Sequence, residues 1–254
     1  MDKYSFTIIT VVKNDQKNIE KTVKSVIINK NKYVEYIIVD GASKDKTLPI
    51  LRKYKRHINK LISQKDSGIY DAMNKGIKNS KNDIIVFCNS GDFFYKGAIK
   101  KIEKIFNKND LDYVFGTVLR NYTEKKILKY KLEPKRIFLN FDFATAHSTG
   151  FFLKREVYNK LGLYKLKFKC SADYDLYFRM IRKGFKGAVT SKKDKIGNVA
   201  SGGFSSKISF FEHLIEESKI RLENKQSIIM IILIFFYSLF RRFMKIFFKF
   251  FFKI

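Results

Sequence analysis

The sequence predicts an α/β fold in which a mostly parallel sheet is flanked by helices. Short apolar runs rich in β-branched residues alternate with helical patterns over residues 1–120, as in parallel βαβ units. Most residues of these runs are apolar, as is typical of strands that are buried on both faces. Polar clusters follow the first four runs, where the carboxyl ends of the strands would lie. Together these observations indicate a Rossmann-like sheet.

The elements of this sheet are expected in a regular order. The run SFTIITVV predicts a first strand, and a helical pattern follows it from about Ile19 to Ile28. The run YVEYIIVD predicts a second strand, and after a turn with Gly41 a helix starts near residues 45–47. The runs NKLIS, DIIVFC and LDYVFGTVL predict the third, fourth and fifth strands, with a helix from about Ile69 before the fourth. Further on, Gly150–Leu153 predicts a strand, and a helix is expected from about Ala172.

The polar clusters predict a binding site at one edge of the sheet. Asn14 follows the first strand, Asp40 the second, Asp66 the third, and the stretch NSGD, residues 89–92, the fourth. Ligands of open α/β sheets sit beyond the carboxyl ends of the strands. Loops between strands and helices also need polar turn formers and helix caps, so any single one of these residues has a structural explanation. Four such clusters in succession on a very basic chain favour a binding site.

The charge of the chain is extreme. The formal net charge is +28, so the surface should attract nucleic acid, lipid headgroups or phosphorylated substrates. Nucleic-acid binding would concentrate Lys and Arg on one recognition element, whereas over residues 1–224 they are scattered along helical segments. We therefore expect no nucleic acid as partner. The two cysteines, Cys88 and Cys170, lack the number and spacing of a disulfide framework or metal site, and together with a start that enters a strand pattern directly they indicate a reduced, cytoplasmic setting.

The polar residues also suggest a particular chemistry. Asp40 and Asp66 can accept hydrogen bonds from the N–H and hydroxyl groups of a base and a ribose. On a helix that starts near Ile69, Asp71 and Asn74 are three apart and so share a face. Asp92 can bind Mg²⁺ or Mn²⁺ together with two phosphate oxygens, because hard cations choose oxygen ligands. Ser-Gly-Asp is also an ordinary turn sequence.

Six stretches of the chain resemble the successive motifs of one enzyme family. They are TIITVVKN, YIIVDGASKDKT, SQKDSGIYDAMNKGI, FCNSGD, AHSTGFF and SADYDLYFRM, and they cover roughly residues 4–205. The family is that of the family 2 glycosyltransferases with the GT-A fold, and the likeness is greatest to the bacterial exopolysaccharide, capsule and O-antigen branch with its colanic-acid type enzymes. The stretch SGIYDAMNKGI together with NSGD is specific, whereas VDGASKDKT is shared more widely in the family.

The resemblance implies roles for individual residues. The residues that would bind the nucleotide-sugar donor are Thr10, Val12, Asn14, Asp40, Asp66, Asp71, Asn74, Ser90 and Gly91. Asp92 would bind the divalent metal, although NSGD keeps only the last carboxylate of the family's Asp-x-Asp motif. Asp173 would be the catalytic base, with Ala172 in place of the Glu that usually precedes it. Asp173 can instead simply support the helix N-terminus behind Ser171.

The acceptor side is less defined. His147 and Gly150 would lie near the acceptor pocket, and a lone histidine is equally consistent with a structural role. Gly202 and Gly203, in SGGFSS, would belong to a loop that closes over the diphosphate, or to a plain flexible linker. The resemblance thus divides the chain into a nucleotide-sugar-binding half (1–120), a half that binds the acceptor and carries the base (121–206), and a helical C-terminal region (207–254).

The tail over about 226–254 differs from the rest. Its apolar block, Ile228–Phe240, is shorter than the ~20 residues that span a bilayer. Basic residues then recur every four positions, and 226–254 contain no acid; these residues are Arg241, Lys245, Lys249 and Lys253. This pattern predicts an amphipathic helix on an anionic membrane surface. A helix packed on the domain or in a dimer, and a re-entrant or spanning segment, are alternatives.

The combined prediction is an inverting, metal-dependent glycosyltransferase with a nucleotide-sugar donor. The acceptor would be a glycan, carried on a polyprenyl diphosphate, and the tail would attach the enzyme to the inner face of the cell membrane. A nucleotidyltransferase would carry a Gly-rich phosphate loop after its first strand, and VVKNDQKN contains no glycine. A non-catalytic, membrane-bound protein that binds sugar nucleotides or nucleic acid is the other alternative.

Overall fold

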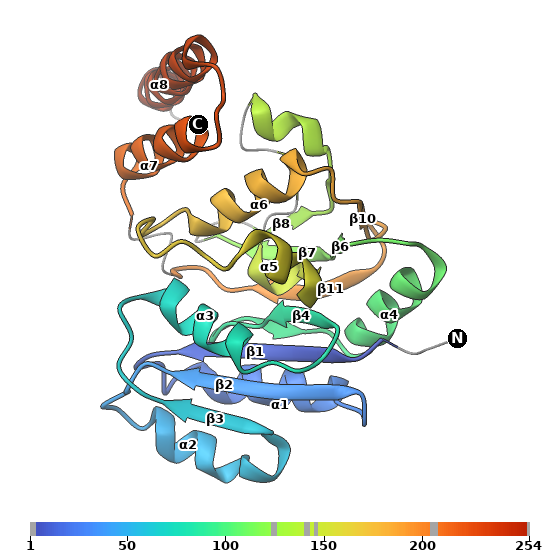
Figure 1. Ribbon diagram of the computed structural model, residues 1–254. Coiled ribbons are helices and arrows are strands. Elements are labelled where there is room, and N and C mark those ends of the chain that lie inside the picture. The colour runs from blue at the N-terminus through green and yellow to red at the C-terminus, as the bar shows by residue number, and fades with distance from the viewer. Residues whose placement is uncertain (1–3, 123–125, 140–142, 145–146, 204–207, 253–254) are drawn as a thin grey trace.

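The main sheet of the computed structural model contains seven strands. They are β1 (Phe6–Val12), β2 (Val34–Asp40), β3 (Lys60–Ser63), β4 (Ile84–Phe87), β6 (Tyr113–Phe115), β9 (Phe151–Lys154) and β10 (Gly187–Val189), and their order in the sheet is β10-β6-β9-β4-β1-β2-β3. β3, β2, β1 and β4 are parallel, whereas β9 is antiparallel to β4 and β6. The predicted α/β fold with a mostly parallel sheet flanked by helices is confirmed (Figure 1). The structure describes residues 4–122, 126–139, 143–144, 147–203 and 208–252.

A second sheet has four strands. They are β5 (Phe93–Phe94), β11 (Lys195–Val199), β7 (Thr117–Asn121) and β8 (Lys126–Lys129), in this spatial order. The prediction of one continuous fifth strand is therefore wrong. The run divides at Gly116 into β6 in the first sheet and β7 in the second. Gly116 allows this division: its N–H donates to Gly150 O at 2.6 Å, and a Cβ atom there would lie 2.7 Å from Ile196 Cγ1.

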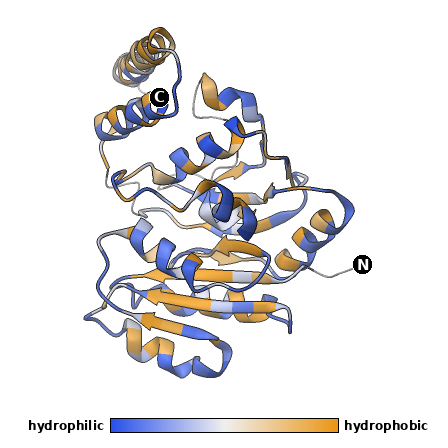
Figure 2. Cartoon of the chain, viewed as in Figure 1, coloured by the Kyte–Doolittle hydropathy of each residue, from blue (hydrophilic) through white to orange (hydrophobic). Residues whose placement is uncertain are grey.

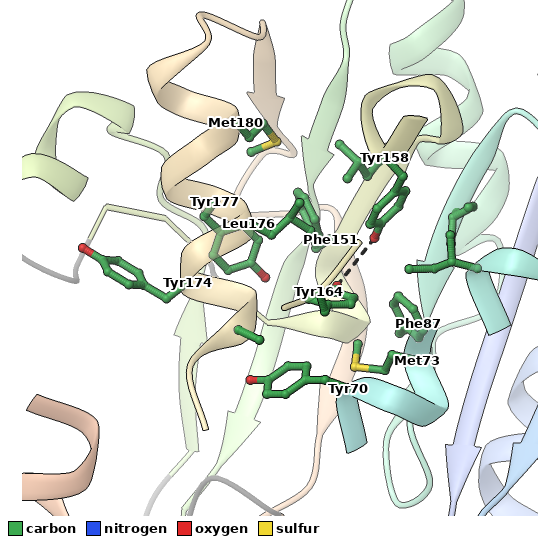
Figure 3. Packing of buried hydrophobic residues seen from close by; sticks show 14 of the residues in the cluster. Tyr70, Met73, Phe87, Phe151, Tyr158, Tyr164, Tyr174, Leu176, Tyr177 and Met180 are labelled. Atoms are coloured by element: carbon green, nitrogen blue, oxygen red, sulfur yellow. Dashed lines mark hydrogen bonds between the residues drawn. The ribbon is translucent and has the colours of Figure 1, made fainter. Parts of the chain in front are cut away.

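Helices cover both faces of the main sheet (Figure 1). They are α1 (Ile19–Asn29), α2 (Thr47–Lys53), α3 (Ile69–Lys78), α4 (Ala98–Lys108), α5 (Arg155–Leu161) and α6 (Ala172–Arg182), with short 3-10 helices η1 (Lys55–His57), η2 (Pro134–Phe138) and η3 (Ser148–Gly150). Successive side chains of a strand point to opposite faces. Ile9 and Val11 of β1 accordingly join the core on the α3 face, and Ile8 and Val12 join the core on the α1 face. Figure 3 shows the first of these cores, where buried side chains of α3 and α6 surround Tyr164.

Two helices at the C-terminus form a separate layer. α7 (Phe210–Glu223) begins with a reciprocal cap in which Ser209 and Glu212 bond each other's backbone N–H, and it packs on α6. α8 (Ile228–Phe252) packs on α7, at the end of the molecule that is remote from β3 (Figure 1). Along its whole length α8 is mostly apolar (Figure 2). Among the described residues, no helix combines the length and the apolar character that crossing a membrane requires.

Candidate active site

The carboxyl ends of β1, β2 and β3 meet at one edge of the sheet in register. Val12 lies opposite Asp40, and Asp40 lies opposite Ser63. Asp40 is fully buried, and its Oδ2 accepts hydrogen bonds from Ser63 Oγ (2.7 Å) and from the backbone N–H of Ser43 (3.0 Å). Its Oδ1 is buried with no hydrogen-bond partner among the described residues. A buried carboxylate oxygen without a donor is costly, so this oxygen is suited to the N–H or hydroxyl group of a ligand.

Asp66 lies directly over the end of β2. A Cβ atom at Gly41 would lie 2.1 Å from Asp66 Oδ2, so only glycine at this position lets the carboxylate approach the β2 loop. Lys13 Nζ is 3.8 Å from Asp66 Oδ1, and the N–H of Gly68 donates to the same oxygen at 3.2 Å. The structure thus brings together Asp40 and Asp66, as the sequence predicts, and adds the cation of Lys13 beside them.

The residues of β1 and its loop that the sequence assigns to the donor build this edge from within. Thr10 is fully buried, with its hydroxyl bonded to Cys88 O (2.7 Å) and 3.0 Å from the hydroxyl of Tyr36. Val12 is also buried, and its carbonyl accepts the N–H of Gly41 at 2.8 Å. Asn14 is exposed, with φ of +50°, and its Oδ1 accepts the backbone N–H of Lys44 at 2.8 Å. The hydroxyl of Thr10 and the backbone of Val12 therefore hold neighbouring strands, and of these three residues only Asn14 presents a polar side chain at the surface.

The two polar residues of α3 serve different segments. Asp71 Oδ2 accepts the N–H of Ser67 (3.0 Å) and pairs with Lys75 Nζ (3.1 Å), and mainly the Ser67 bond lowers the pKa of Asp71. Asn74 is buried and bonds both backbone groups of Tyr164, at 2.8 and 3.1 Å. In this structure, Asp71 therefore closes the loop before α3, and Asn74 fixes the loop after α5.

The NSGD turn is tied to three other segments. Ser90 Oγ donates to Asp15 Oδ2 at 2.6 Å, and the N–H of Gly91 donates to Thr22 Oγ1 at 3.0 Å. Asp92 Oδ1 accepts the N–H of Ala200 at 2.9 Å, and its Oδ2 accepts the hydroxyl of Thr149. Burial raises the pKa of Asp92 to about 6, although both of these hydrogen bonds favour the charged form. Asp92 thereby joins the end of β4 to η3 and to the end of β11.

These contacts do not fit a metal site built from side chains. Both oxygens of Asp92 already accept hydrogen bonds from the protein. Across the part of the chain that the structure describes, no group of three or more His, Cys, Asp or Glu residues is placed to hold a metal ion. A divalent cation takes six or more oxygen ligands, or keeps several waters beside one or two carboxylates. Asp92 as metal ligand therefore stays a prediction, and a cation there would take its other ligands from water and from the donor's phosphate oxygens.

Asp173 lies in the first turn of α6, close to α3. Its Oδ1 accepts hydrogen bonds from the Tyr70 hydroxyl and from the N–H of Tyr174, both at 2.9 Å. Burial raises the pKa of Asp173, and these two bonds oppose the rise. Tyr70 belongs to the first turn of α3, which directly follows the segment that holds Asp66. The N-terminus of α3 thus connects Asp173 to the edge of the sheet where Asp40 and Asp66 lie.

The four residues assigned to the acceptor side lie at η3 and shortly after β11, two segments that Asp92 links. His147 precedes η3, and burial, followed by the charges of Arg120 and Lys129, lowers its pKa to about 3, so it is neutral at pH 7. Gly150 serves close packing, because a Cβ atom there would lie 2.7 Å from Gly116 O. Gly202 and Gly203 are exposed after β11, and the rest of the SGGFSS stretch from residue 204 lies outside the described residues.

Sequence reasoning missed four residues that contact this site. Tyr70 and Thr149 bond Asp173 and Asp92, while Glu216 and Glu217 reach the start of α6 from α7. Burial, together with the charges of Asp173 and Glu216 and against that of Arg221, raises the pKa of Glu217 to about 8. Tyr70 directly precedes Asp71 in a motif that the sequence singles out. Thr149 lies in AHSTGFF, another of these motifs. Glu216 and Glu217 lie outside the six motifs, and their contacts join residues far apart in the chain.

Comparison with known proteins assigns the fold to a class and the chain to a family. The Rossmann-like sheet is that of the GT-A glycosyltransferase structures. The chain belongs to glycosyl transferase family 2, which it matches over residues 7–186, and it is a glycosyltransferase. This assignment removes the nucleotidyltransferase and the non-catalytic alternatives that the sequence left open.

Relatives agree with this family. An uncharacterized glycosyltransferase of Mycobacterium tuberculosis is 28% identical over 177 residues, which are 68% of this chain and 67% of that protein. A PGL/p-HBAD biosynthesis glycosyltransferase of Mycobacterium bovis is 26% identical over 151 residues, 57% of either chain. S. aureus TarS in complex with UDP-GlcNAc superposes with a TM-score of 0.72 at 15% identity, over 94% of this chain and 72% of that chain. The mannosyltransferase PcManGT from Pyrobaculum calidifontis, in complex with GDP-Man and Mn²⁺, gives 0.62 at 15% identity, over 88% and 64%.

Proposed function

We propose that this glycosyltransferase takes a sugar from a nucleotide-diphosphate sugar and transfers it with inversion to a glycan acceptor. The observation that carries the proposal is the pair Asp40 and Asp66 at the shared carboxyl edge of β1, β2 and β3. Asp40 keeps one buried oxygen without a partner, and Asp66 lies over Gly41 beside Lys13. Two oxygen acceptors and a cation suit a base, a ribose and a diphosphate. Complexes of TarS with UDP-GlcNAc and of PcManGT with GDP-Man support this donor class.

The remaining donor residues support the same edge indirectly. The end of β1 is set by Thr10, Val12 and Asn14. The NSGD turn is fixed by the hydrogen bonds of Ser90 and Gly91 to α1 and the loop before it. The loop before α3 is held by Asp71, and the loop after α5 by Asn74. In the proposed function these residues give the donor pocket its shape, largely through the backbone. Asp40 and Asp66 supply its hydrogen-bond acceptors.

Asp173 is the proposed base. Its carboxylate takes the proton of the acceptor hydroxyl while that oxygen forms a bond to the anomeric carbon on the face opposite the diphosphate. The bond from the anomeric carbon to the diphosphate oxygen breaks, and the nucleoside diphosphate leaves with the electron pair. Burial raises the pKa of Asp173, which strengthens it as a proton acceptor, and Tyr70 fixes its orientation. Because the base must be ionised, the rate should fall as the pH drops through this raised pKa.

The proposal includes a divalent cation, Mn²⁺ or Mg²⁺, only as an ion that would bind the diphosphate of the donor. PcManGT was crystallised with Mn²⁺, whereas the side chains around Asp92 do not form a metal site in this structure. We therefore derive no catalytic step through a metal, and the cation remains a prediction.

The acceptor and the location of the enzyme complete the proposal. We place the enzyme in the synthesis of bacterial surface polysaccharides, of the exopolysaccharide, capsule or O-antigen kind, with an acceptor carried on a polyprenyl diphosphate. The exposed apolar side chains of α8, together with its basic residues, support peripheral attachment to an anionic membrane surface on the cytoplasmic side. Membrane attachment and a lipid-linked acceptor fit each other, because both place the reaction at the bilayer.

Release of nucleoside diphosphate from a panel of UDP-, GDP- and dTDP-sugars tests the function. The wild-type enzyme should turn over at least one donor, with an acceptor or slowly with water. Asp173→Asn keeps an oxygen that can accept the Tyr70 hydroxyl, so it should fold and bind donor, yet lose turnover by about 10²-fold or more. Turnover like that of the wild type in Asp173→Asn would remove the base assignment. A wild-type enzyme inert toward the whole panel would contradict the proposed donor class.

A further inference from the structure

The carboxylate of Glu216, on α7, is held by three consecutive backbone N–H groups that precede α6. Its Oε1 accepts the N–H of Lys169 at 2.6 Å, and its Oε2 accepts the N–H groups of Cys170 (2.8 Å) and Ser171 (2.7 Å). The thiol of Cys170 is a further donor to Oε2 at 2.9 Å. Successive N–H groups that converge in this way form an anion-binding concavity, and here a carboxylate of the same chain fills it.

The charge state of Glu216 agrees with this geometry. Burial acts to raise its pKa, but the hydrogen bonds from residues 169–171 outweigh burial and hold the pKa below its ordinary value. The carboxylate is therefore ionised at neutral pH, and its bonds to the N–H groups are charge-assisted, which makes them roughly twice as strong as neutral ones.

The segment that Glu216 holds leads directly into Asp173. Ser171 is the N-cap of α6, and Asp173 is the second residue of the helix. From the opposite side, the Tyr70 hydroxyl of α3 lies 3.1 Å from Cys170 O and 2.9 Å from Asp173 Oδ1. Residues 169–173 thus lie between two contacts, one from α3 and one from α7. A third contact, between His213 Nδ1 and Ser171 Oγ at 3.3 Å, again comes from α7.

We propose that Glu216 is a positioning residue for Asp173 and that α7 is thereby a working part of the active site. The inference rests on the proposed function of Asp173 as base. Without Glu216, the N–H groups of residues 169–171 would lose this acceptor. The remaining described side-chain hydrogen bonds from other helices to residues 169–173 would be those of Tyr70 and His213. A displacement of about 1 Å at a catalytic group can lower a rate 10²-fold. Among the described residues, the hydrogen bonds of Glu216 go to residues 169–171 and not to the donor edge at β1, β2 and β3, so donor binding should be unaffected.

The chain offers a matched control on the same helix. Glu212 is one turn before Glu216, and its carboxylate also accepts a backbone N–H, that of Ser209 at 2.9 Å. That bond caps α7 itself and does not touch residues 169–171. Glu212→Gln therefore reports what a loss of carboxylate charge does to α7, and Glu216→Gln and Glu216→Ala report what it does to the segment before Asp173.

The experiment measures kcat, donor KM and the pH profile with the active donor of the UDP-, GDP- and dTDP-sugar panel. We expect Glu216→Ala to lower kcat about tenfold or more with donor KM within about twofold. Glu216→Gln, which keeps one oxygen acceptor, should lie between Glu216→Ala and the wild type, and Glu212→Gln should match the wild type. Because burial raises the pKa of Asp173, a looser segment should move the acid limb of the kcat profile to lower pH in Glu216→Ala only.

Amide hydrogen exchange gives a readout that needs no activity. The N–H groups of residues 169–171 should be protected in the wild type and in Glu212→Gln, and should exchange faster in Glu216→Ala. Unchanged exchange, or wild-type kcat with an unmoved acid limb, would overturn the role of Glu216. An equal loss of kcat in Glu212→Gln would overturn it too, because general weakening of α7 would then explain both. Full turnover in Asp173→Asn, measured alongside, would instead overturn the proposed base and the inference with it.

Discussion

At the scale of single residues, burial and hydrogen bonding set the charge of four carboxyl groups in and around the candidate site. They are those of Asp92, Asp173, Glu216 and Glu217. Burial raises the pKa of Asp173, of Asp92 to about 6 and of Glu217 to about 8. The pKa of Glu216 is lowered instead, because its carboxylate accepts three backbone N–H groups. At pH 7 Glu217 is therefore mostly neutral while Glu216 is ionised, although the two are neighbours in the sequence. Such separation of pKa values is how one site holds groups in different protonation states.

The raised pKa of Glu217 predicts a pH-dependent penalty on stability. In the unfolded chain this carboxyl has a pKa of 4.5, and in the folded protein about 8. A group whose pKa is raised on folding contributes stability that is complete below its unfolded pKa, here 4.5. This stability is lost as the pH rises through the folded pKa, here about 8. Glu217→Gln removes the titration, so it should match the wild type near pH 4.5. At pH 8.5 it should be more stable by about 4 kcal/mol, a Tm increase of about 8–16 °C.

Thermal unfolding at both pH values checks this prediction. Glu156→Gln on α5 is the control, because its side chain is 52% exposed and the substitution removes the same charge from the surface. A Glu217→Gln variant with the same small Tm difference from the wild type at both pH values would contradict the prediction, because it would show that folding does not raise the pKa of Glu217.

Two substitutions at Asp92 separate a structural link from a metal ligand. Asp92→Asn can keep both contacts, because its oxygen accepts the Ala200 N–H and its amide can donate to Thr149 Oγ1. Asp92→Ala leaves both partners unpaired and should lower the free energy of unfolding by about 2 kcal/mol. If Asp92 links β4, η3 and β11, Asp92→Asn should retain the donor affinity of the wild type in Mn²⁺ and in EDTA. Calorimetry in which Asp92→Asn loses a Mn²⁺-dependent part of the donor affinity would establish the metal role.

At the scale of elements, the regular strands and helices of the first half follow from local pattern. β1, β2 and β4 are continuous apolar runs, and α1, α3 and α6 have helical spacing of their buried residues, so periodicity identifies them. The edge cluster follows as well, because parallel strands end on the same side. Short strands such as β5 and β11 are different, since their pairing joins residues about a hundred positions apart.

The same limit applies to the candidate site. Asp40 and Asp66 come from strand ends and were predictable, whereas the contact of Thr149 with Asp92 depends on how η3 approaches the NSGD turn. Polar residues such as Thr10 and Asn74 show a further ambiguity. Both are buried and bond the backbone of other segments, which composition cannot distinguish from ligand binding. α7 carries no motif at all, and only the fold brings its Glu216 to α6.

α8 presents two faces that the structure distinguishes. Exposed apolar side chains recur at spacings of three and four and therefore form one stripe; they are Ile229, Ile232, Phe236, Phe240, Phe243 and Phe247. Ile228, Ile231 and Phe235 line a groove of about 390 Å³ toward α7, and Ile232 lies at the boundary because it also lines this groove. Arg241, Arg242 and Lys245 follow on positions off the stripe, and Arg242 lies 5.5 Å from the ring of Phe210 at the start of α7. The stripe is thus left without a partner in the described chain.

At the scale of the whole molecule, the α7–α8 pair would place the Asp173 side of the enzyme toward a bilayer. α7 contacts the segment before Asp173 on one side and α8 on another, so one helix separates the proposed base from the stripe of α8. Neighbouring helix axes are about 8–10 Å apart. If the stripe enters the membrane, a lipid-linked acceptor needs to rise only a short distance to reach Asp173, which the N-terminus of α3 connects to the donor edge.

Vesicle binding tests this orientation. The wild-type protein should sediment with vesicles of phosphatidylcholine and phosphatidylglycerol, and less with phosphatidylcholine alone, because each Lys or Arg near an anionic surface contributes about 1 kcal/mol.

Phe236→Glu combined with Phe240→Glu removes two stripe residues that are 64% and 60% exposed. Each buried apolar side chain contributes about 1.5–3 kcal/mol, so the partition coefficient should fall about a hundredfold or more. Ile28→Glu with Leu166→Glu, which alters two exposed apolar residues outside α8, adds the same charge and should bind almost as the wild type does. Equal loss in both double variants would mean that net charge alone drives binding. A wild-type dimer in lipid-free sedimentation that the stripe variant converts to monomer would show that a second copy of the chain, and not a bilayer, covers α8.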